Sequence, residues 1–516
     1  MTHRFGFFRL LAVFLMVVVM ACAMQARAQT RVVLAVGGQP ETLDPYNTNT
    51  TMTMAVTKSF YEGLYQFDRN FEIKPVLALR YTVSDDGLVY TFELRSGVKF
   101  HDGTVFDANA VKVNFDRAKD PANALVRYNQ FNRIERVEVV DPLTVRFVLK
   151  EPFGPFINTI AHPSAAIISP KALQQYGKDI AFHPVGTGPY TFAEWRQTDF
   201  IKGTRFEGYW RTGYPKVDEV IWMPVMENNT RAAMLQTGEA DFAFPVPYEQ
   251  VDGLKSNRSL QVITTPSIMM RYLSFNMLHK PFDDIRVRQA INYAINREAL
   301  AKVAFNGYAF PAQGFVPQGV AYAHKMAPWP YDPAKARALL AEAGYPNGFE
   351  SVLWGGINNT TTQKVLQFLQ QQLGQVGIKV SILGLESGQR AGWVEGAPDP
   401  QTAGVRLYYI GWSTSTGEAD WALRPLLSTQ AWPPGLNNTA YYSSAQFDAY
   451  LEQALKATGD EDKRTIYQKA QELLAVDLPW APLVTDEIVY AHNKRVTGIY
   501  VLPDSNIDIN ELAVSE

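Results

Sequence analysis

The sequence predicts an α/β protein of more than one domain, and two observations carry that prediction. A chain of 516 residues is too long to fold around one hydrophobic core. Its later half also contains a strand–helix–strand pattern over residues 350–385, in which Val365, Phe368, Leu369 and Leu373 mark the packed face of the helix. Such a unit implies two parallel strands joined by a right-handed crossover.

Short strands and one capped helix are predicted early in the chain. Apolar or alternating residues predict strands at 31–36, 90–95, 136–141 and 144–150. The last two are separated only by Pro142-Leu143, which predicts a hairpin. Asp107 is placed to cap the helix that follows it. We also expect a helix over 57–64, where apolar residues recur at steps of four.

Longer helices are predicted in the second half. A helix over 230–237 leads to a strand, and residues 285–296 form an amphipathic helix. Asp332 caps another helix, which Gly344 ends. No internal repeat or low-complexity linker separates these segments, so we expect interwoven domains.

Composition favours a folded protein that binds a small ligand. Apolar residues make up 47% of the chain and charged residues 19%. The formal net charge of −3, without a Lys/Arg cluster, argues against nucleic-acid binding. Aromatic residues reach 12%, and aromatic side chains commonly line ligand pockets.

The first 28 residues have the layout of a secretory signal peptide. Arg4 and Arg9 precede an apolar run, and Ala26-Arg27-Ala28 fits a cleavage site. Its removal takes the basic residues from 48 to 45 against 51 acidic ones, a net charge of −6. Cys22 is the only cysteine and lies inside this segment, so lipid anchoring through Cys22 is the rival interpretation. We favour cleavage and a periplasmic protein without a thiol.

The sequence contains no local motif for catalysis or metal binding. HExxH, the Gly-x-Ser-x-Gly elbow and the phosphate-binding loop are absent. The seven histidines are scattered without the spacing of metal ligands. We therefore expect no catalytic residue, no metal and no cofactor, although a secreted peptidase or amidase assembled from distant segments stays open as an alternative.

Several stretches resemble one family of receptors. They are Glu41–Pro45, Phe92–Gly103, Gly186–Tyr190 and Arg288–Asn296. Together these stretches resemble the extracytoplasmic solute-binding proteins of family 5, the peptide, nickel and related receptors of ABC importers. Residues 228–250, 328–349 and 411–423 are similar to those of the family's glutathione receptors.

The resemblance implies a periplasmic-binding-protein fold with two lobes, a hinge and a ligand cleft between the lobes. Lobe I would comprise residues 29–69, 184–277 and 488–516, with an extra domain inserted at 70–183. Lobe II would comprise residues 278–487. Closure of the lobes would exclude water and strengthen polar contacts to the ligand.

The stretch GWSTSTGEADW, Gly411–Trp421, is the main candidate for the site. Peptide receptors of the family typically place an aspartate three residues after the tryptophan, to bind the ligand's ammonium, whereas this chain has Ser415. A serine hydroxyl can donate to the carboxylate beside the ammonium of a γ-glutamyl group, which an aspartate would repel. Glu418 or Asp420 would then bind the ammonium. Both are alternatively turn or capping residues, and Trp412 is either a pocket wall or a core residue.

Arginines are expected to bind the two carboxylates of glutathione. The candidates, each alternatively a surface salt-bridge residue, are Arg127, Arg271, Arg390 and Arg406. Tyr46, in the turn after the first strand, is a candidate wall of the cleft.

The sequence thus predicts a periplasmic receptor that binds glutathione and delivers it to an inner-membrane ABC permease with ATPase subunits. We expect a monomer and no chemical turnover. A receptor for other di- or tripeptides is the alternative within the same class, and the serine at position 415 argues against it.

Overall fold

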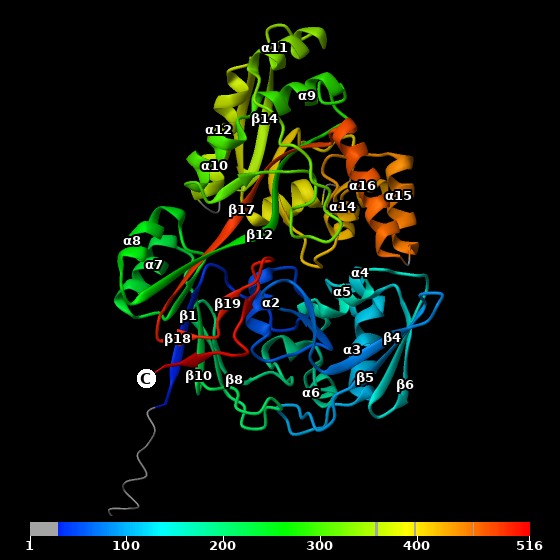
Figure 1. Ribbon diagram of the computed structural model, residues 1–516, viewed down its shortest axis with the longest axis vertical. Helices are drawn as coiled ribbons and strands as arrows, with labels where there is room; N and C mark the ends of the chain where they lie inside the picture. The colour runs from blue at the N-terminus through cyan, green and yellow to red at the C-terminus, as the bar shows by residue number, and fades with distance from the viewer. Residues whose placement is uncertain (1–28, 357–359, 397–398, 458, 516) are drawn as a thin grey trace, which may run out of the picture.

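The computed structural model describes residues 29–356, 360–396, 399–457 and 459–515. The predicted signal segment, including Cys22, lies outside these residues. Two halves lie one above the other and are joined by two long strands, β12 (Leu260–Phe275) and β17 (Trp480–Asn493) (Figure 1). We call the half formed by residues before β12 and after β17 lobe I, and the half between these strands lobe II.

One mixed sheet runs through both lobes of the described chain, with β12 and β17 at its centre. On the lobe II side the order is β15 (Ile378–Leu385), β14 (Phe349–Gly356), β16 (Leu407–Ser413) and then β12. On the lobe I side β17 is followed by β11 (Phe242–Phe244), β1 (Arg31–Val36), β10 (Glu219–Pro224), β9 (Phe200–Arg205) and β8 (Tyr190–Arg196). The short β13 (Ala309–Pro311) pairs with β17 off this path.

The carboxyl ends of two strand groups face each other across the junction of the lobes. In lobe II, β14 is parallel to both β15 and β16, and β16 is antiparallel to β12, so all three run toward lobe I. In lobe I, β1 is parallel to β10 and β11, and β11 is antiparallel to β17, so these strands run toward lobe II. Ligands of open α/β sheets bind at carboxyl ends of strands, so the fold itself places a site between the lobes.

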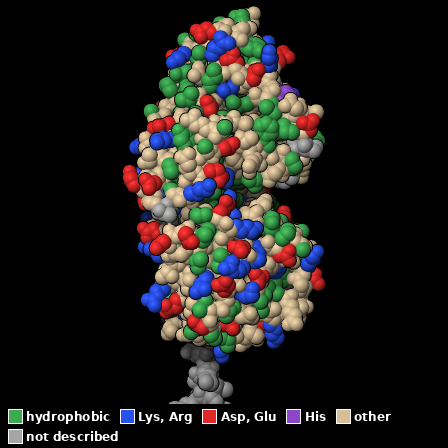
Figure 2. Space-filling model, turned by 90° about the vertical axis from the view of Figure 1, so that its right-hand side faces the viewer, with side chains coloured by type: hydrophobic (Ala, Val, Ile, Leu, Met, Phe, Trp, Pro, Cys, Tyr) green, Lys and Arg blue, Asp and Glu red, His purple; other side chains and the backbone are tan. Residues whose placement is uncertain are grey.

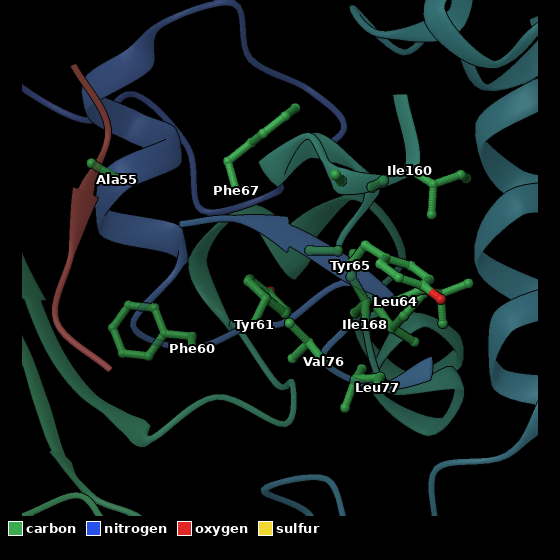
Figure 3. Packing of buried hydrophobic residues seen from close by; sticks show 14 of the residues in the cluster. Ala55, Phe60, Tyr61, Leu64, Tyr65, Phe67, Val76, Leu77, Ile160 and Ile168 are labelled. Atoms are coloured by element: carbon green, nitrogen blue, oxygen red, sulfur yellow. The ribbon is translucent and has the colours of Figure 1, made fainter. Parts of the chain in front are cut away.

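A four-stranded antiparallel sheet flanks lobe I, in the order β4 (Ala78–Val83), β5 (Val89–Leu94), β7 (Thr144–Leu149) and β6 (Ile134–Asp141). Helices α3 (Ala108–Lys119), α4 (Tyr128–Phe131), α5 (Phe156–Ala161) and α6 (Pro170–Tyr176) accompany it. Its core is continuous with that of lobe I, because Phe60, Leu64 and Tyr65 pack in one cluster with Ile160 and Ile168 (Figure 3). The segment is therefore fused to lobe I and has no separate core.

Helices of lobe II form two groups around its part of the sheet. One group packs on β14 and β15 and comprises α9 (Ile285–Ala294), α10 (Arg297–Phe305), α11 (Pro333–Glu342) and α12 (Thr360–Gly374). The other comprises α14 (Ala419–Leu427), α15 (Ala445–Lys456) and α16 (Asp460–Asp477), and it faces α4 and α5 of lobe I (Figure 1).

Most elements expected from hydrophobic periodicity are confirmed. The strand β1, the β6–β7 hairpin and the parallel β14–α12–β15 unit form where predicted, and Asp107 accepts a hydrogen bond from the Ala110 amide at the start of α3. The expected helix over 57–64 is wrong, since α2 spans Thr51–Thr57.

The apolar residues at 57–64, which had suggested a helix there, are buried for another reason. The main chain after α2 folds into the core and binds the segment around Gly188. The carbonyl of Phe60 accepts from the Gly188 amide at 3.0 Å, and that of Ser59 accepts from the Tyr190 amide at 3.0 Å. These carbonyls therefore accept hydrogen bonds from a neighbouring segment and not from amides of a helix.

Candidate ligand-binding site

The loop that follows β16 reaches across to lobe I. The Asn158 side chain on α5 donates to the Thr416 carbonyl at 2.7 Å. Gly417, at φ +70°, lies so close to Phe71 that a Cβ would be 2.9 Å from its ring. That ring stacks on Phe67, with centroids 4.3 Å apart. The loop therefore lies at the carboxyl end of a parallel strand and in direct contact with the opposite lobe.

Three polar atoms of this loop are buried without a hydrogen-bond partner among the described residues. They are Ser413 Oγ, Thr414 Oγ1 and Glu418 Oε1. A buried polar group without a partner costs about 1–3 kcal/mol, so three in one loop need a compensating role. Ser415 lies between them and is partly exposed. Two hydroxyls and a carboxyl group suit a ligand with both a carboxylate and an ammonium.

Glu418 and Asp420 differ sharply in their surroundings. Burial, followed by the neighbouring Asp420 charge, raises the pKa of Glu418 to about 8. Glu418 precedes α14 but its side chain does not cap that helix. Asp420 is instead paired with Arg424, whose Nε lies 3.0 Å from its Oδ1. Of the two expected ammonium ligands, Glu418 keeps an unpartnered oxygen, whereas Asp420 is already neutralised.

A cavity of about 460 Å³ lies between the lobes beside this loop. Lobe II contributes Thr416, Asp420, Trp421 and Arg424 to its lining, and lobe I contributes Gln130 among other residues. The space-filling view shows a notch between the two halves of the molecule (Figure 2). The cavity combines aromatic and polar walls, as small-molecule sites do.

Trp412 is half-buried beneath the loop. Its indole N–H donates to the Trp421 carbonyl at 2.8 Å, and the two indole rings lie 5.9 Å apart. Trp412 packs on the hydrophobic cluster of α14–α16, so it supports the first turn of α14. Trp421, in contrast, lines the interlobe cavity.

Arg127 lies in lobe I at the start of α4 and is only 8% exposed. Its Nε donates to the Thr48 carbonyl at 2.7 Å, and its Nη1 lies 3.4 Å from Gln130 Oε1. Burial lowers its pKa to about 10. Within the described chain Arg127 has no carboxylate at ion-pair distance, so it is a buried positive charge close to the cleft.

Arg271 forms an ion pair on the crossing strands. Its Nη2 lies 2.9 Å from Asp486 Oδ2, and its Nε lies 3.3 Å from Oδ1. The guanidinium packs under Gly411, where a Cβ would be 2.6 Å from Nη1. We expected this arginine to bind a ligand carboxylate. The structure instead uses it to link β12 to β17 beneath the loop, because Asp486 provides the counter-charge.

The remaining candidates also have internal partners. Arg406 donates through Nη1 to the carbonyls of Ala403 and Val405 at 2.7 and 2.8 Å, which holds the turn before β16. Arg390 lies 3.3 Å from Glu395 Oε1 and keeps 42% of its side chain exposed.

Tyr46 is a core residue rather than a cleft wall. It is fully buried, and its hydroxyl donates to the Ala166 carbonyl at 2.7 Å. The turn after β1 folds back against the segment around Ala166, and this contact removes the Tyr46 ring from the surface.

Residues that sequence reasoning missed include Ser413, Thr414, Asn158, Gln130 and Asp486. The two hydroxyl residues follow Trp412 in the stretch already singled out, so the motif contained a signal for them. Asn158 and Gln130 reach the site only through tertiary packing, and nothing in their local sequence marks them.

No metal centre and no membrane-spanning helix is found in the part of the chain that the structure describes. Across residues 29–515, apart from the gaps given above, no three His, Cys, Asp or Glu side chains are grouped to hold a metal ion. Over the same residues, every helix is too short or too polar to cross a bilayer.

Sequence comparison defines the class of protein. Residues 72–434 match the model of the bacterial extracellular solute-binding proteins, family 5 Middle. The chain belongs to this family of solute-binding proteins and is not an enzyme, which sets aside the peptidase or amidase alternative.

Relatives and solved structures refine this picture. The glutathione-binding protein GsiB of Escherichia coli K12 is 54% identical over 510 residues, covering 99% of this chain and 98% of that relative. GsiB of Salmonella paratyphi A is 56% identical over 489 residues, covering 95% of each chain. The periplasmic binding protein DppA of Helicobacter pylori, in complex with the peptide STSA, has a TM-score of 0.82 at 28% identity, covering 94% of this chain and 98% of DppA. A dipeptide-binding protein from Pseudoalteromonas, in complex with Met-Leu, has a TM-score of 0.83 at 26% identity, covering 94% and 100%.

Proposed function

We propose that this chain binds glutathione between its two lobes and delivers it to an ABC permease. The identity of 54–56% to proteins named as glutathione-binding, over nearly the whole chain, supports this ligand. The observation that carries the proposal is the Glu418 carboxyl group, which is buried at the start of α14, two residues from the cavity-lining Thr416 and Asp420, with one oxygen unpartnered among the described residues.

The γ-glutamyl end of glutathione carries an ammonium and a carboxylate on one carbon. In the proposed complex Glu418 accepts from the ammonium, and the hydroxyls of Ser413, Thr414 and Ser415 donate to the adjacent carboxylate. An aspartate at position 415 would lie beside that carboxylate and repel it. Two charge-assisted contacts of about 1.5–3 kcal/mol each, with burial of the rest of the ligand, support micromolar affinity at roughly −8 kcal/mol.

The roles expected for the four arginines and for Tyr46 are revised in this proposal. Arg271 and Arg406 hold the scaffold together and Tyr46 belongs to the core, whereas Arg390, which remains partly exposed, is kept as a candidate. Arg127 is retained on the lobe I side, where a buried positive charge favours a carboxylate.

We propose that the signal segment directs export and is cleaved after Ala28, which would release a periplasmic monomer that docks on an inner-membrane permease with ATPase subunits. Mass spectrometry of the mature protein should find Gln29 at the N-terminus. An acylated Cys22 would instead mean a membrane-anchored receptor.

Calorimetric titration of the purified mature protein tests the ligand. We expect micromolar binding of glutathione and much weaker binding of Ala-Cys-Gly, which lacks the γ-linked head. Equal binding of both, or of a mixture of plain tripeptides, would leave a peptide receptor and refute the glutathione assignment.

A further inference from the structure

Gln130 faces the interlobe cavity with one end of its amide fixed. Its Oε1 accepts from Ser164 Oγ at 3.2 Å and from Arg127 Nη1 at 3.4 Å. Its Nε2 is buried and has no hydrogen-bond partner among the residues described. Because the carbonyl oxygen and the NH₂ diverge from the same carbon of one planar amide, two donors that hold the oxygen leave the NH₂ pointing in a different direction. Because Gln130 lines the cavity, a ligand bound there is the candidate partner for this donor.

The wall behind Gln130 has donors and positive charge in excess. Arg127 is buried there, and its other nitrogens contact the Thr48 carbonyl and Met54 Sδ rather than an acid. His162, on the same wall, has its pKa lowered well below the usual range, chiefly by burial and also by the Arg127 charge. A guanidinium that donates to an amide oxygen polarises the amide and strengthens its N–H groups as donors. The partner missing from this wall is therefore a hydrogen-bond acceptor, and the buried Arg127 charge favours a carboxylate in that role.

We propose that Gln130 is a ligand-contacting residue whose Nε2 donates to the glycine carboxylate of glutathione, with Arg127 as the positioning residue behind it. This assignment rests on the proposed function, which places the other carboxylate and the ammonium at the 413–418 loop. Thr416 and Asp420 line the same cavity as Gln130, so one ligand can contact both walls. Arg127 thus acts on the ligand through Gln130.

The test compares glutathione with the analogue in which the glycine carboxylate is a carboxamide. By calorimetry the wild-type protein should bind the acid more tightly than the amide by about tenfold or more, since the hydrogen bond is charge-assisted. Gln130→Met keeps the length of the side chain but removes the donor, and it should abolish this preference mainly by weakening the acid. Asn129→Ala is the matched control, since Asn129 lines the same cavity and should leave the preference intact.

A double variant separates positioning from simple stability. Arg127→Met should reduce the acid-over-amide preference when Gln130 is present and have no further effect on it in the Gln130→Met background. A loss of folding alone would weaken both ligands equally, and thermal melting of each variant measures that contribution.

The outcomes are distinct. Wild-type binding of glutathione without any acid preference, or a preference that survives Gln130→Met, overturns the role of Gln130 and leaves the proposed function standing. Failure of the wild-type protein to bind glutathione overturns both proposals.

Discussion

Glutathione binding should release a proton, because of the state of Glu418. With a pKa of about 8, this carboxyl group is mostly protonated at neutral pH. By the ordinary titration relation about 90% of it carries a proton at pH 7. An ammonium placed at its unpartnered oxygen favours the ionised form and returns the pKa toward the ordinary value of 4.5. Binding at pH 7 should therefore release about 0.9 proton per ligand.

The same linkage predicts how affinity depends on pH. Each pH unit below 8 costs about 1.4 kcal/mol to ionise the carboxyl before it meets the ammonium. Affinity should therefore weaken about fivefold from pH 8 to pH 7 and about tenfold for each further unit toward pH 5, and it should level off about one unit above pH 8, until the ligand's ammonium titrates.

Calorimetry in buffers of different ionisation enthalpy measures the released proton directly. The observed binding enthalpy should vary linearly with the buffer's ionisation enthalpy, and the slope gives the number of protons. S-methylglutathione, which has no titrating thiol, should give the same slope, and Glu418→Gln should remove it. A slope of zero for the wild-type protein, or an unchanged slope in Glu418→Gln, would refute the role given to this carboxyl group.

Three further changes have defined outcomes. Asn158→Ala removes the hydrogen bond to the Thr416 carbonyl that links the two lobes. Stopped-flow kinetics should then show glutathione dissociating several-fold faster, with little change in its association rate. An unchanged dissociation rate would mean that the contact does not stabilise the closed form. Asp486→Asn leaves the Arg271 guanidinium without its counter-charge. Loss of one partner of a buried ion pair should lower the free energy of unfolding in urea by about 3–5 kcal/mol. A loss under about 1 kcal/mol would show that water already screens the pair. Burial holds the pKa of Glu418 near 8, so the unfolded chain loses this proton at lower pH than the folded chain. Glu418→Gln should therefore match the wild-type stability near pH 4 and become more stable than wild type as pH rises from about 5 to 8. A difference in Tm that does not change with pH would contradict this.

Local sequence patterns correctly predicted those helices and strands that depend only on residues close together in the sequence. The β14–α12–β15 unit follows from apolar spacing along the helix and two β-rich flanks. The capped start of α3 follows from one aspartate in the right place. The helix expected over 57–64 failed because the carbonyls of Ser59 and Phe60 bind a segment more than a hundred residues away, and hydrophobic periodicity contains no information about that contact.

Part of the candidate site could likewise be predicted from the local sequence, and part depends on tertiary contacts. The stretch after Trp412 could be recognised from its residues, since small hydroxyl side chains beside carboxylates suggest a polar recognition loop. The partners of the arginines could not, because Asp486 meets Arg271 only when β17 pairs with β12. An arginine's role depends on whether a carboxylate already lies beside it, and that is a property of the tertiary fold.

In the proposed complex the 413–418 loop recognises the γ-glutamyl head. The most direct measurement is a calorimetric comparison of glutathione with its α-linked isomer, Glu-Cys-Gly, which has the same atoms and the same net charge. We expect the γ-linked form to bind at least tenfold more tightly, because only it presents an ammonium and a carboxylate on one carbon to Glu418 and the adjacent hydroxyls. Equal affinity for the two isomers would contradict it.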